Sequence, residues 1–272
     1  MIQDISVHFD NSYHPCLPEP DSRAFLFSED RIMLSYDEKN KQLIIPLCEQ
    51  FKSASFQYLF KTDVAYFLAH EKQNEPAGFR YCSLREIRDL ELERNDEIFL
   101  CYCAYHLHKW YQNNQYCGCC GNKTVPSEKE RALCCPKCHN TIYPRLNPAV
   151  IVAIRNKDRL LLTKYKSGFA HNALVAGFVE FGETLEECVE REVYEETGLK
   201  VKNITYYKSQ PWGIAQDILA GFYCDVDGDD TIRMDDNELK YAAWVERKDI
   251  VLQPGHFSLT NEMMEMFKNS RL

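Results

Sequence analysis

The sequence predicts an α+β protein with a β-rich N-terminal domain, a short cysteine-rich module and a C-terminal domain of mixed strands and helices. Short strand-like segments separated by polar turns extend to about residue 110. Six cysteines then occur within residues 117–138, and a second series of strands and helices follows. Because 272 residues exceed the usual size of one domain, we expect domains at 1–112, 113–143 and 144–272.

The composition is that of an ordinary folded protein, with 45% hydrophobic and 27% charged residues. A net charge of −9 disfavours a protein that coats nucleic acid but is compatible with an acidic site that binds cations. The first thirty residues contain no sustained apolar run, and the most apolar stretch, 146–154, is far shorter than the roughly 20 residues of a membrane span. We therefore expect a cytoplasmic protein with no membrane partner.

The N-terminal domain is predicted from its alternation of apolar and polar residues. Strands are expected at 23–28, 31–36, 42–46, 55–59 and 64–68. Ile98, Tyr102, Tyr105 and Trp110 recur with near-helical spacing, which predicts a helix over 96–111. The domain contains no identifiable chemistry, so we assign it a structural or dimerising role.

The cysteine-rich module contains two CxxC pairs, and their spacing predicts a metal site. Fourteen residues separate the pairs, which allows four thiolates to converge on one Zn²⁺ ion. The expected ligands are Cys117, Cys120, Cys135 and Cys138. Four cysteine ligands indicate a closed structural site, because catalytic zinc keeps one position for water. Buried or redox cysteines are the alternative, and Cys119 or Cys134 could shift the set of ligands.

The C-terminal domain is predicted as two strands, a helix, three further strands and a last helix. The first two strands are expected at 149–154 and 159–163, joined by the turn residues 156–158. The helices are expected at 184–197 and 259–269. The remaining strands are expected near 204–208, 218–225 and 241–245.

The first of these helices has clear end signals and carries acidic residues close to its apolar stripe. Thr184 and Glu187 form a capping box, and Gly198 suits the left-handed residue that ends a helix. At about 100° per residue, Glu192 and Glu196 lie roughly 40° apart, beside apolar neighbours. Such carboxylates repel each other unless a cation compensates them, and hard oxygen ligands favour Mg²⁺ or Mn²⁺.

Residues 177–199 match the pattern Gx5Ex7REUxEExGU at every fixed position, and in this the chain resembles the Nudix hydrolase superfamily. The resemblance implies an α/β/α sandwich and metal-dependent cleavage of a diphosphate bond. It assigns the main metal ligands to Glu192 and Glu196, with Glu195 assisting. Arg191 is implied as their charge partner, and Glu183 could orient Arg191 or contact a metal through an outer shell.

Glu238, downstream of the Nudix pattern, is a candidate for an additional metal ligand or for the general base. An exposed acid within the acidic run from Asp235 is an equally good interpretation. Which carboxylate acts as the base stays open, because members of the superfamily differ on this point.

The zinc-ribbon spacing, followed by Tyr143-Pro144-Arg145 and the Nudix pattern, resembles the NADH pyrophosphatase (NudC-like) subfamily. That subfamily carries the motif SQPWPFPxS, whereas residues 209–217 read SQPWGIAQD. The loss of the rigid Pro-Phe-Pro segment and the carboxylate of Asp217 put a preference for NAD(H) in doubt.

Residues on the substrate side are also implied by this resemblance. Phe178 and Tyr143 are the rings expected to stack on a base, with core packing as the alternative for both. Trp212 is a pocket wall or a packing residue. The other candidate substrate contacts are Gln210, Asp217 and Ser258.

The leading functional hypothesis is hydrolysis of NADH or NAD⁺ to nicotinamide mononucleotide and AMP, with NAD-capped RNA as a related substrate. ADP-ribose, FAD or dinucleoside polyphosphates are the alternative substrates, because the SQPW region is altered. A non-catalytic nucleotide sensor is the alternative of another class, and the intact set of glutamates argues against it. The subfamily also implies a homodimer.

Overall fold

The computed structural model describes residues 1–51, 54–70, 73–166 and 171–271. It divides into two compact units. One consists of Met1–Ile2, Leu146–Trp212 and Asp217–Leu272, and the other consists of Gln3–Arg145 and Gly213–Gln216. Among the described residues, no helix is long and apolar enough to span a membrane.

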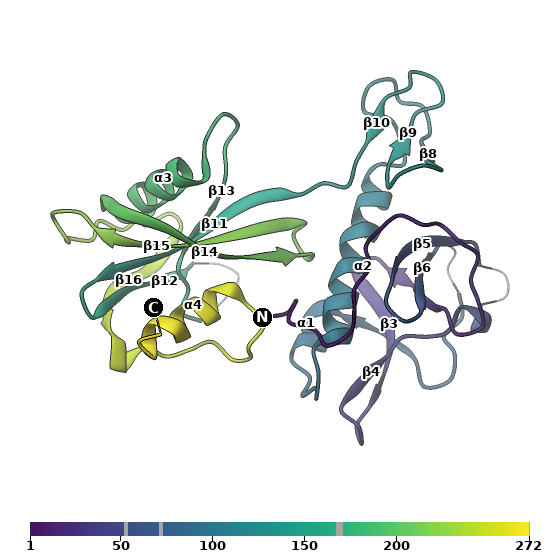
Figure 1. Ribbon diagram of the computed structural model, residues 1–272, viewed down its shortest axis with the longest axis horizontal. Coiled ribbons are helices and arrows are strands. Elements are labelled where there is room, and N and C mark those ends of the chain that lie inside the picture. The colour runs from purple at the N-terminus through teal and green to yellow at the C-terminus, as the bar shows by residue number, and fades with distance from the viewer. Residues whose placement is uncertain (52–53, 71–72, 167–170, 272) are drawn as a thin grey trace. The chain divides into compact units, whose positions relative to one another are not determined.

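The unit that contains the N-terminal region is rich in short strands, as predicted. One sheet has the order β1 (Arg23–Phe25), β6 (Ala65–Ala69), β5 (Phe56–Lys61). In the other, β3 (Arg31–Asp37) pairs with β2 (Phe27–Ser28), β4 (Gln42–Ile44) and β7 (Arg80–Ser83). Figure 1 labels β3 and β4 of this sheet. A short 3-10 helix spans Cys48–Gln50. Buried side chains such as Leu26, Met33 and Phe67 form the core of this region.

The predicted long helix is α2 (Asp96–Asn113), and its apolar positions are buried as the spacing required. The ring of Phe27 stacks on His108 of α2 with 4.3 Å between ring centroids. A short helix, α1 (Leu84–Arg88), precedes α2 and was not predicted. Its capping box of Ser83 and Glu86 is a sequence signal that could have revealed it.

The cysteine-rich module follows α2 as a small antiparallel sheet of β8 (Val125–Pro126), β9 (Leu133–Cys134) and β10 (Thr141–Ile142). Two hydrogen bonds connect it to the N-terminal segment of the same unit. The Tyr13 hydroxyl donates to the Ser127 carbonyl at 2.9 Å, and Arg131 donates to the Asn11 carbonyl at 3.0 Å. The module is therefore held by the N-terminal region as well as by its own sheet.

The other unit contains a six-stranded mixed sheet with the path β14 (Val201–Trp212), β15 (Asp217–Val226), β11 (Asn147–Asn156), β12 (Arg159–Tyr165), β16 (Leu239–Glu246). The sixth strand, β13 (Val175–Phe178), lies off this path, pairs with β11 and was not predicted. The central pair β11 and β15 is parallel, and the other pairs are antiparallel. The β11–β12 hairpin turns at Lys157, whose φ is +56°, within the predicted turn.

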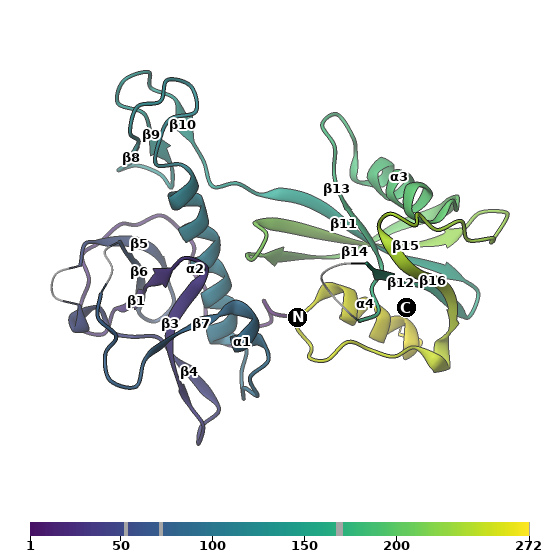
Figure 2. The same ribbon diagram turned by 180° about the vertical axis from the view of Figure 1, so that it is seen from behind.

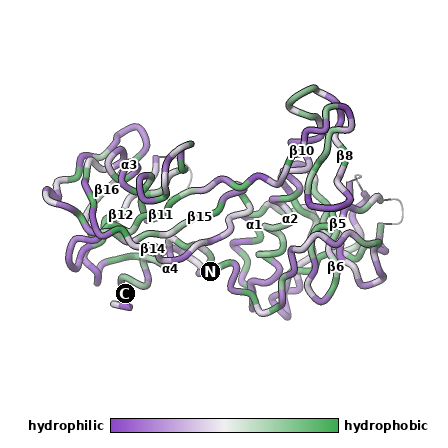
Figure 3. The backbone as a smooth tube through the Cα atoms, turned by 45° about the horizontal axis from the view of Figure 1, so that its top comes forward, coloured by the Kyte–Doolittle hydropathy of each residue, from purple (hydrophilic) through white to green (hydrophobic). Residues whose placement is uncertain are grey.

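Two helices cover the two faces of this sheet and make it an α/β/α sandwich (Figures 1 and 2). Helix α3 (Leu185–Thr197) buries Cys188, Val189 and Val193 against one face. Helix α4 (Leu259–Lys268) buries Leu259, Met263 and Phe267 against the other. A 3-10 helix spans Arg247–Asp249. Figure 3 shows the hydrophobic residues concentrated along β11 and β12, as expected for strands covered on both faces.

Candidate active site and structural metal site

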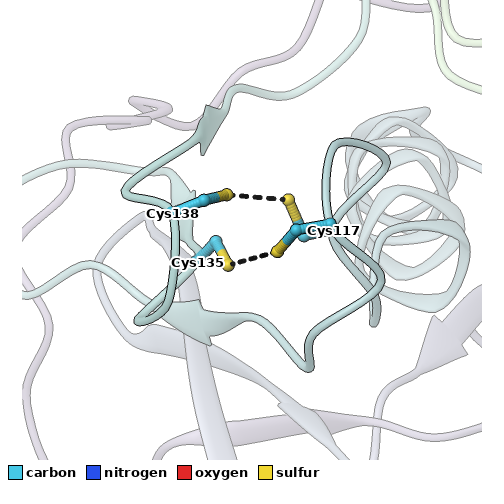
Figure 4. A group of neighbouring side chains, drawn as sticks. Cys117, Cys135 and Cys138 are labelled. Carbon is cyan, nitrogen blue, oxygen red and sulfur yellow. Dashed lines mark hydrogen bonds between the residues drawn. The ribbon is translucent and has the colours of Figure 1, made fainter.

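The four predicted zinc ligands lie together in the cysteine-rich module, and Figure 4 labels three of them, Cys117, Cys135 and Cys138. Their sulfur atoms all lie within 4.8 Å of one another, with 3.6 Å between Cys117 and Cys138 and 3.4 Å between Cys120 and Cys135. Zn–S bonds of about 2.3 Å in a tetrahedron place sulfurs about 3.8 Å apart. The arrangement therefore fits a structural Zn²⁺ ion, and Cys119 and Cys134 lie outside the ligand group.

Each CxxC pair is shaped by the same backbone turn. The Gly121 amide donates to the Cys117 carbonyl at 2.8 Å, and the His139 amide donates to the Cys135 carbonyl at 3.0 Å. Both turn residues have positive φ, +71° and +61°. Hydrogen bonds from the amides of Cys119 and Cys120 lower the pKa of Cys117 to about 6, which favours the thiolate that binds metal.

The acidic helix α3 begins and ends at the predicted residues. Thr184 Oγ1 accepts from the Glu187 amide at 3.2 Å, and Glu187 accepts from the Thr184 amide at 2.8 Å. Gly198 ends the helix with a φ of +70°, and its amide donates to the Tyr194 carbonyl at 2.8 Å. The capping box and the terminal glycine are thus confirmed.

Arg191 lies at the centre of the acidic cluster. Its guanidinium donates to both carboxylate oxygens of Glu183 at 2.7 and 2.9 Å, to Glu192 at 2.6 Å and to Glu195 at 3.0 Å. It also donates to the Phe178 carbonyl at 2.9 Å, which connects α3 to the end of β13. The contact with Arg191 lowers the pKa of Glu183 to about 2. One guanidinium therefore compensates three of the clustered carboxylates.

Glu196 is a buried acid of this helix that makes no contact with Arg191 in the described residues. Glu196 is only 2% exposed, and its Oε2 atom has no hydrogen-bond partner among the described residues. The Tyr165 hydroxyl donates to Oε1 at 3.3 Å. Burial, with repulsion from Glu238 and Glu192, raises the pKa of Glu196 to about 8. A buried oxygen without a partner, near other carboxylates, fits the donor set of a hard divalent cation.

Glu238 belongs to the same acidic neighbourhood, since its charge contributes to the raised pKa of both Glu192 and Glu196. Its side chain is exposed, and it lies directly before β16. The backbone carbonyl of Glu238 accepts from the Lys166 amide at 2.9 Å, which fixes the strand end. This position suits a metal ligand or base that approaches from solvent, and either role stays a prediction.

Gly177 provides the space in which Glu192 lies. A Cβ atom at this position of β13 would be 1.9 Å from the Glu192 carboxyl carbon, so a side chain here would displace the Glu192 carboxylate. The Glu192 side chain is only 13% exposed, and burial is the main cause of its raised pKa. Glycine at the start of the 177–199 pattern therefore leaves room for the Glu192 carboxylate to lie close to the strand.

The two aromatic residues predicted to stack on a base are both accessible. Phe178, at the end of β13, is 55% exposed, and Tyr143 is 57% exposed. Tyr143 belongs to the unit with the cysteine-rich module, where its hydroxyl donates to Glu130 at 3.0 Å. The exposure of both rings weakens the core-packing alternative. Their contact with a substrate stays a prediction.

Gln210 and Ser258 hold the segment that leads into α4. Gln210 is completely buried, and its side-chain amide donates to the Phe257 carbonyl and accepts from the Leu259 amide, both at 2.7 Å. Ser258 is the N-cap of α4 and accepts from the Asn261 amide at 3.1 Å. These contacts give both residues a structural role, and a role in substrate binding stays a prediction.

Asp217 and Trp212 flank the turn between β14 and β15. Asp217 is nearly buried and accepts from the Asn147 side chain at 3.2 Å, and Trp212 is half-buried. Asn147 precedes β11's apolar run, so Asp217 fixes the paired ends of two central strands. Whether either side chain also contacts substrate stays a prediction.

The altered turn at residues 213–216 has a steric explanation within its own unit. A Cβ atom on Gly213 would lie 2.2 Å from the carbonyl oxygen of Tyr102 in α2. Gln216 donates to the His106 carbonyl of the same helix at 3.2 Å. The turn therefore needs a glycine where the SQPWPFPxS motif has proline.

Comparisons with known proteins agree with this geometry. Residues 145–267 match the NUDIX domain family, and residues 112–143 match the NADH pyrophosphatase zinc ribbon domain. Over 187 residues the chain is 38% identical to the proteins named NAD-capped RNA hydrolase NudC from Escherichia fergusonii and Shigella flexneri. The match covers 67% of this chain and 70% of each relative. The chain is a NudC-like member of the Nudix hydrolase family.

A solved structure agrees with the Nudix fold. The crystal structure of a Nudix hydrolase from Nitrosomonas europaea aligns with a TM-score of 0.51 at 21% identity. The alignment covers 58% of this chain and 92% of that one. This likeness supports the fold of the C-terminal domain.

One residue beside the Nudix helix was missed from the sequence. Tyr165, at the end of β12, donates its hydroxyl to Glu196, although 31 residues separate the two along the chain. No motif marks this tyrosine. It became visible only when β12 and α3 were placed in space.

We predict that loss of zinc destabilises the unit that contains the ribbon, because ligation supplies folding free energy to a small module. The Cys135→Ser variant, or zinc removal by a chelator, should lower Tm by at least about 5 °C, since each kcal/mol is worth about 2–4 °C in a domain of this size. Calorimetry with metal analysis measures this, and Cys119→Ser is the control. An unchanged Tm after proven zinc loss would contradict a structural role.

A second prediction concerns the ion pair of Glu183 with Arg191. Glu183→Gln should lower the free energy of unfolding by about 1–3 kcal/mol at pH 7, the usual range for hydrogen bonds to charged groups. Because the pKa of Glu183 is lowered in the folded protein, its contribution is present above pH 4.5 and is lost as the pH falls towards 2. Denaturant unfolding at several pH values, with Glu190→Gln as control, measures this difference. If Glu183→Gln lowered the free energy of unfolding by the same amount at every pH, the ion pair of Glu183 with Arg191 would not be the cause.

Proposed function

We propose that this Nudix hydrolase cleaves the diphosphate bond of NADH and NAD⁺, which releases nicotinamide mononucleotide and AMP. One observation supports a metal-dependent reaction most directly: within the described part of the chain, Glu196 Oε2 is buried without a hydrogen-bond partner, and Glu238 and Glu192 both raise its pKa. Arg191 contacts Glu183, Glu192 and Glu195 but not Glu196. The zinc ribbon and the names of the relatives support NAD(H) as the substrate class.

In this proposal Glu192 and Glu196 hold Mg²⁺ or Mn²⁺, with Glu195 and Glu238 at the solvent side of the cluster. Such ions, when bound, neutralise charge on the attacked phosphorus and lower the pKa of a water molecule. Arg191 keeps Glu192 and Glu195 in place through its short hydrogen bonds. Glu238 is exposed, and its charge raises the pKa of both Glu192 and Glu196. It is our candidate for the base that takes the proton from water.

Phe178 is the proposed stacking surface for a base of the dinucleotide. It is the last residue of β13, the strand that lies against Glu192, and Arg191 donates to its carbonyl while the ring stays exposed. An exposed ring on a fixed backbone can stack on a heterocycle with little loss of conformational entropy. A longer substrate, such as RNA with a 5′ NAD cap, presents the same diphosphate, so we include it as a second substrate.

ADP-ribose, FAD and dinucleoside polyphosphates are the alternative substrates. Two observations favour them: the turn at 213–216 lacks the Pro-Phe-Pro segment, and Gly213 lies against α2. A turn used for packing in this way offers no aromatic wall to the substrate. The choice among these dinucleotides is therefore a question of relative kcat/KM.

We predict that Glu196→Gln lowers kcat by at least about 100-fold, because even groups behind a metal ligand cost 10–100-fold in affinity or activity. The Gln side chain keeps the size of Glu196 but cannot supply an anionic ligand. Initial rates with NADH at saturating Mg²⁺ measure the effect. Glu190→Gln, on the solvent side of the same helix, should retain activity, and an active Glu196→Gln enzyme would refute the assignment.

A substrate panel tests the proposal as a whole. We expect NADH to exceed ADP-ribose about 10-fold in kcat/KM, because one stacked ring is worth about 1–3 kcal/mol. Chromatography of the products should show nicotinamide mononucleotide and AMP. The same assay includes NAD⁺, NAD-capped RNA and diadenosine polyphosphates. Higher kcat/KM for ADP-ribose would favour the alternative, and no turnover of any diphosphate would indicate a sensor.

A further inference from the structure

Tyr165 makes a contact that neither the Nudix pattern nor the zinc ribbon accounts for. Its hydroxyl lies 3.3 Å from Oε1 of Glu196, while Oε2 of the same carboxylate is buried and has no partner among the described residues. We propose that Tyr165 is a positioning residue that fixes Glu196 through Oε1, so that Oε2 is directed towards a catalytic divalent cation. This inference rests on the proposed function, in which Glu196 is a metal ligand.

The pairing of β12 with β16 is irregular at Tyr165. Along β12 and β16, Lys164 pairs with Tyr241, but Tyr165 pairs with Leu239, so the register shifts between Lys164 and Tyr165. A β-bulge bends its strand and changes the direction of the next side chain, and bulges are frequent beside active sites. Here the extra residue is Lys240 of β16, opposite Tyr165, and Glu238 immediately precedes Leu239, the residue paired with Tyr165.

The hydroxyl has a choice of two acceptors. Besides Glu196 it lies 3.5 Å from the carbonyl oxygen of Leu174. A phenol donates one hydrogen, and a carboxylate is the stronger acceptor because it carries charge. The shorter distance also favours Glu196. When Glu196 is ionised, the hydrogen bond from Tyr165 therefore stabilises the anion and fixes the rotation of its carboxylate group.

Fixing one oxygen also determines the direction of the other. The Glu196 residue is only 2% exposed, so bulk water cannot replace a lost donor easily. Without the hydroxyl the anionic form would lose a hydrogen bond in a buried environment, and the Ala176 amide would be the remaining donor that favours it. Removing a group that orients a metal ligand typically weakens metal binding 10–100-fold.

The test is the Tyr165→Phe variant, which removes the hydroxyl and keeps the ring. Mn²⁺ binding to the full-length zinc-loaded protein is measured by electron paramagnetic resonance without substrate. We expect the Kd for Mn²⁺ to rise at least about 10-fold. With NADH, the metal concentration for half-maximal rate should rise similarly, while KM for NADH at saturating metal stays unchanged.

The matched control is Tyr223→Phe in the same sheet. The Tyr223 hydroxyl is buried and donates to the Met263 carbonyl of α4 at 2.8 Å, so this variant also loses one buried hydroxyl contact. It lies on the sheet face covered by α4, away from the acidic helix. Its Tm should change as much as that of Tyr165→Phe, but its Kd for Mn²⁺ should equal that of the wild type.

Two results would overturn the inference. One is an unchanged Kd for Mn²⁺ in Tyr165→Phe, and the other is a Kd for Mn²⁺ that rises as much in Tyr223→Phe as in Tyr165→Phe. A double variant tests whether Tyr165 acts through Glu196. In the Glu196→Gln background, Tyr165→Phe should cause no further loss of Mn²⁺ affinity, and a full additional loss would also overturn it. Because Mn²⁺ binding is measured without turnover, failure to hydrolyse NADH would refute the proposed function and leave this test intact.

Discussion

The Arg191 guanidinium is the contact on which the acidic site depends. Glutamates crowded on two turns of one helix would repel each other, and burial would raise the cost further. Arg191 donates to Glu183, Glu192 and Glu195 and also to the Phe178 carbonyl. The planar guanidinium, with five donors in fixed directions, can make these contacts at once, which a lysine could not do. The same contacts fix the connection between β13 and α3.

The acids of the site divide into two groups because Arg191 reaches only some of them. The compensated group includes Glu183, whose lowered pKa keeps it ionised. Glu196 lies outside this reach, and its burial raises its pKa. A bound cation would therefore contact carboxylates that Arg191 already holds in place. It would also contact Glu196, which Arg191 does not reach. This difference follows from which side of the helix faces the sheet.

The two candidate metal environments in this chain also differ in chemistry and in their relation to folding. The four cysteine sulfurs are soft donors in a closed cluster within a small module, which suits a structural ion. The carboxylates are hard donors on a helix that already packs on a six-stranded sheet through Val189 and Val193. Removing metal from the first should therefore affect stability, whereas the second can exist without its ion.

Local signals allowed much of the fold to be predicted. The apolar spacing of α2, the capping box and terminal glycine of α3, and five strands of the C-terminal sheet are set by residues close in sequence. Helix α1 was missed although Ser83 and Glu86 form a capping box. Strand β13 was missed because it has four residues, too few for a periodic pattern to be recognised.

The sequence by itself determined the helix that carries the glutamates, the four cysteine ligands and the membership of the Nudix family, because these depend on the order and spacing of neighbouring residues. Only the tertiary structure decided that Glu196 is buried out of contact with Arg191, that Gly177 lies against the Glu192 carboxylate, and that Tyr165 contacts Glu196. The physical reason is that these properties arise from contacts between strands and a helix far apart along the chain. Burial and charge at Glu196 depend on β12, β13 and the start of β16 together.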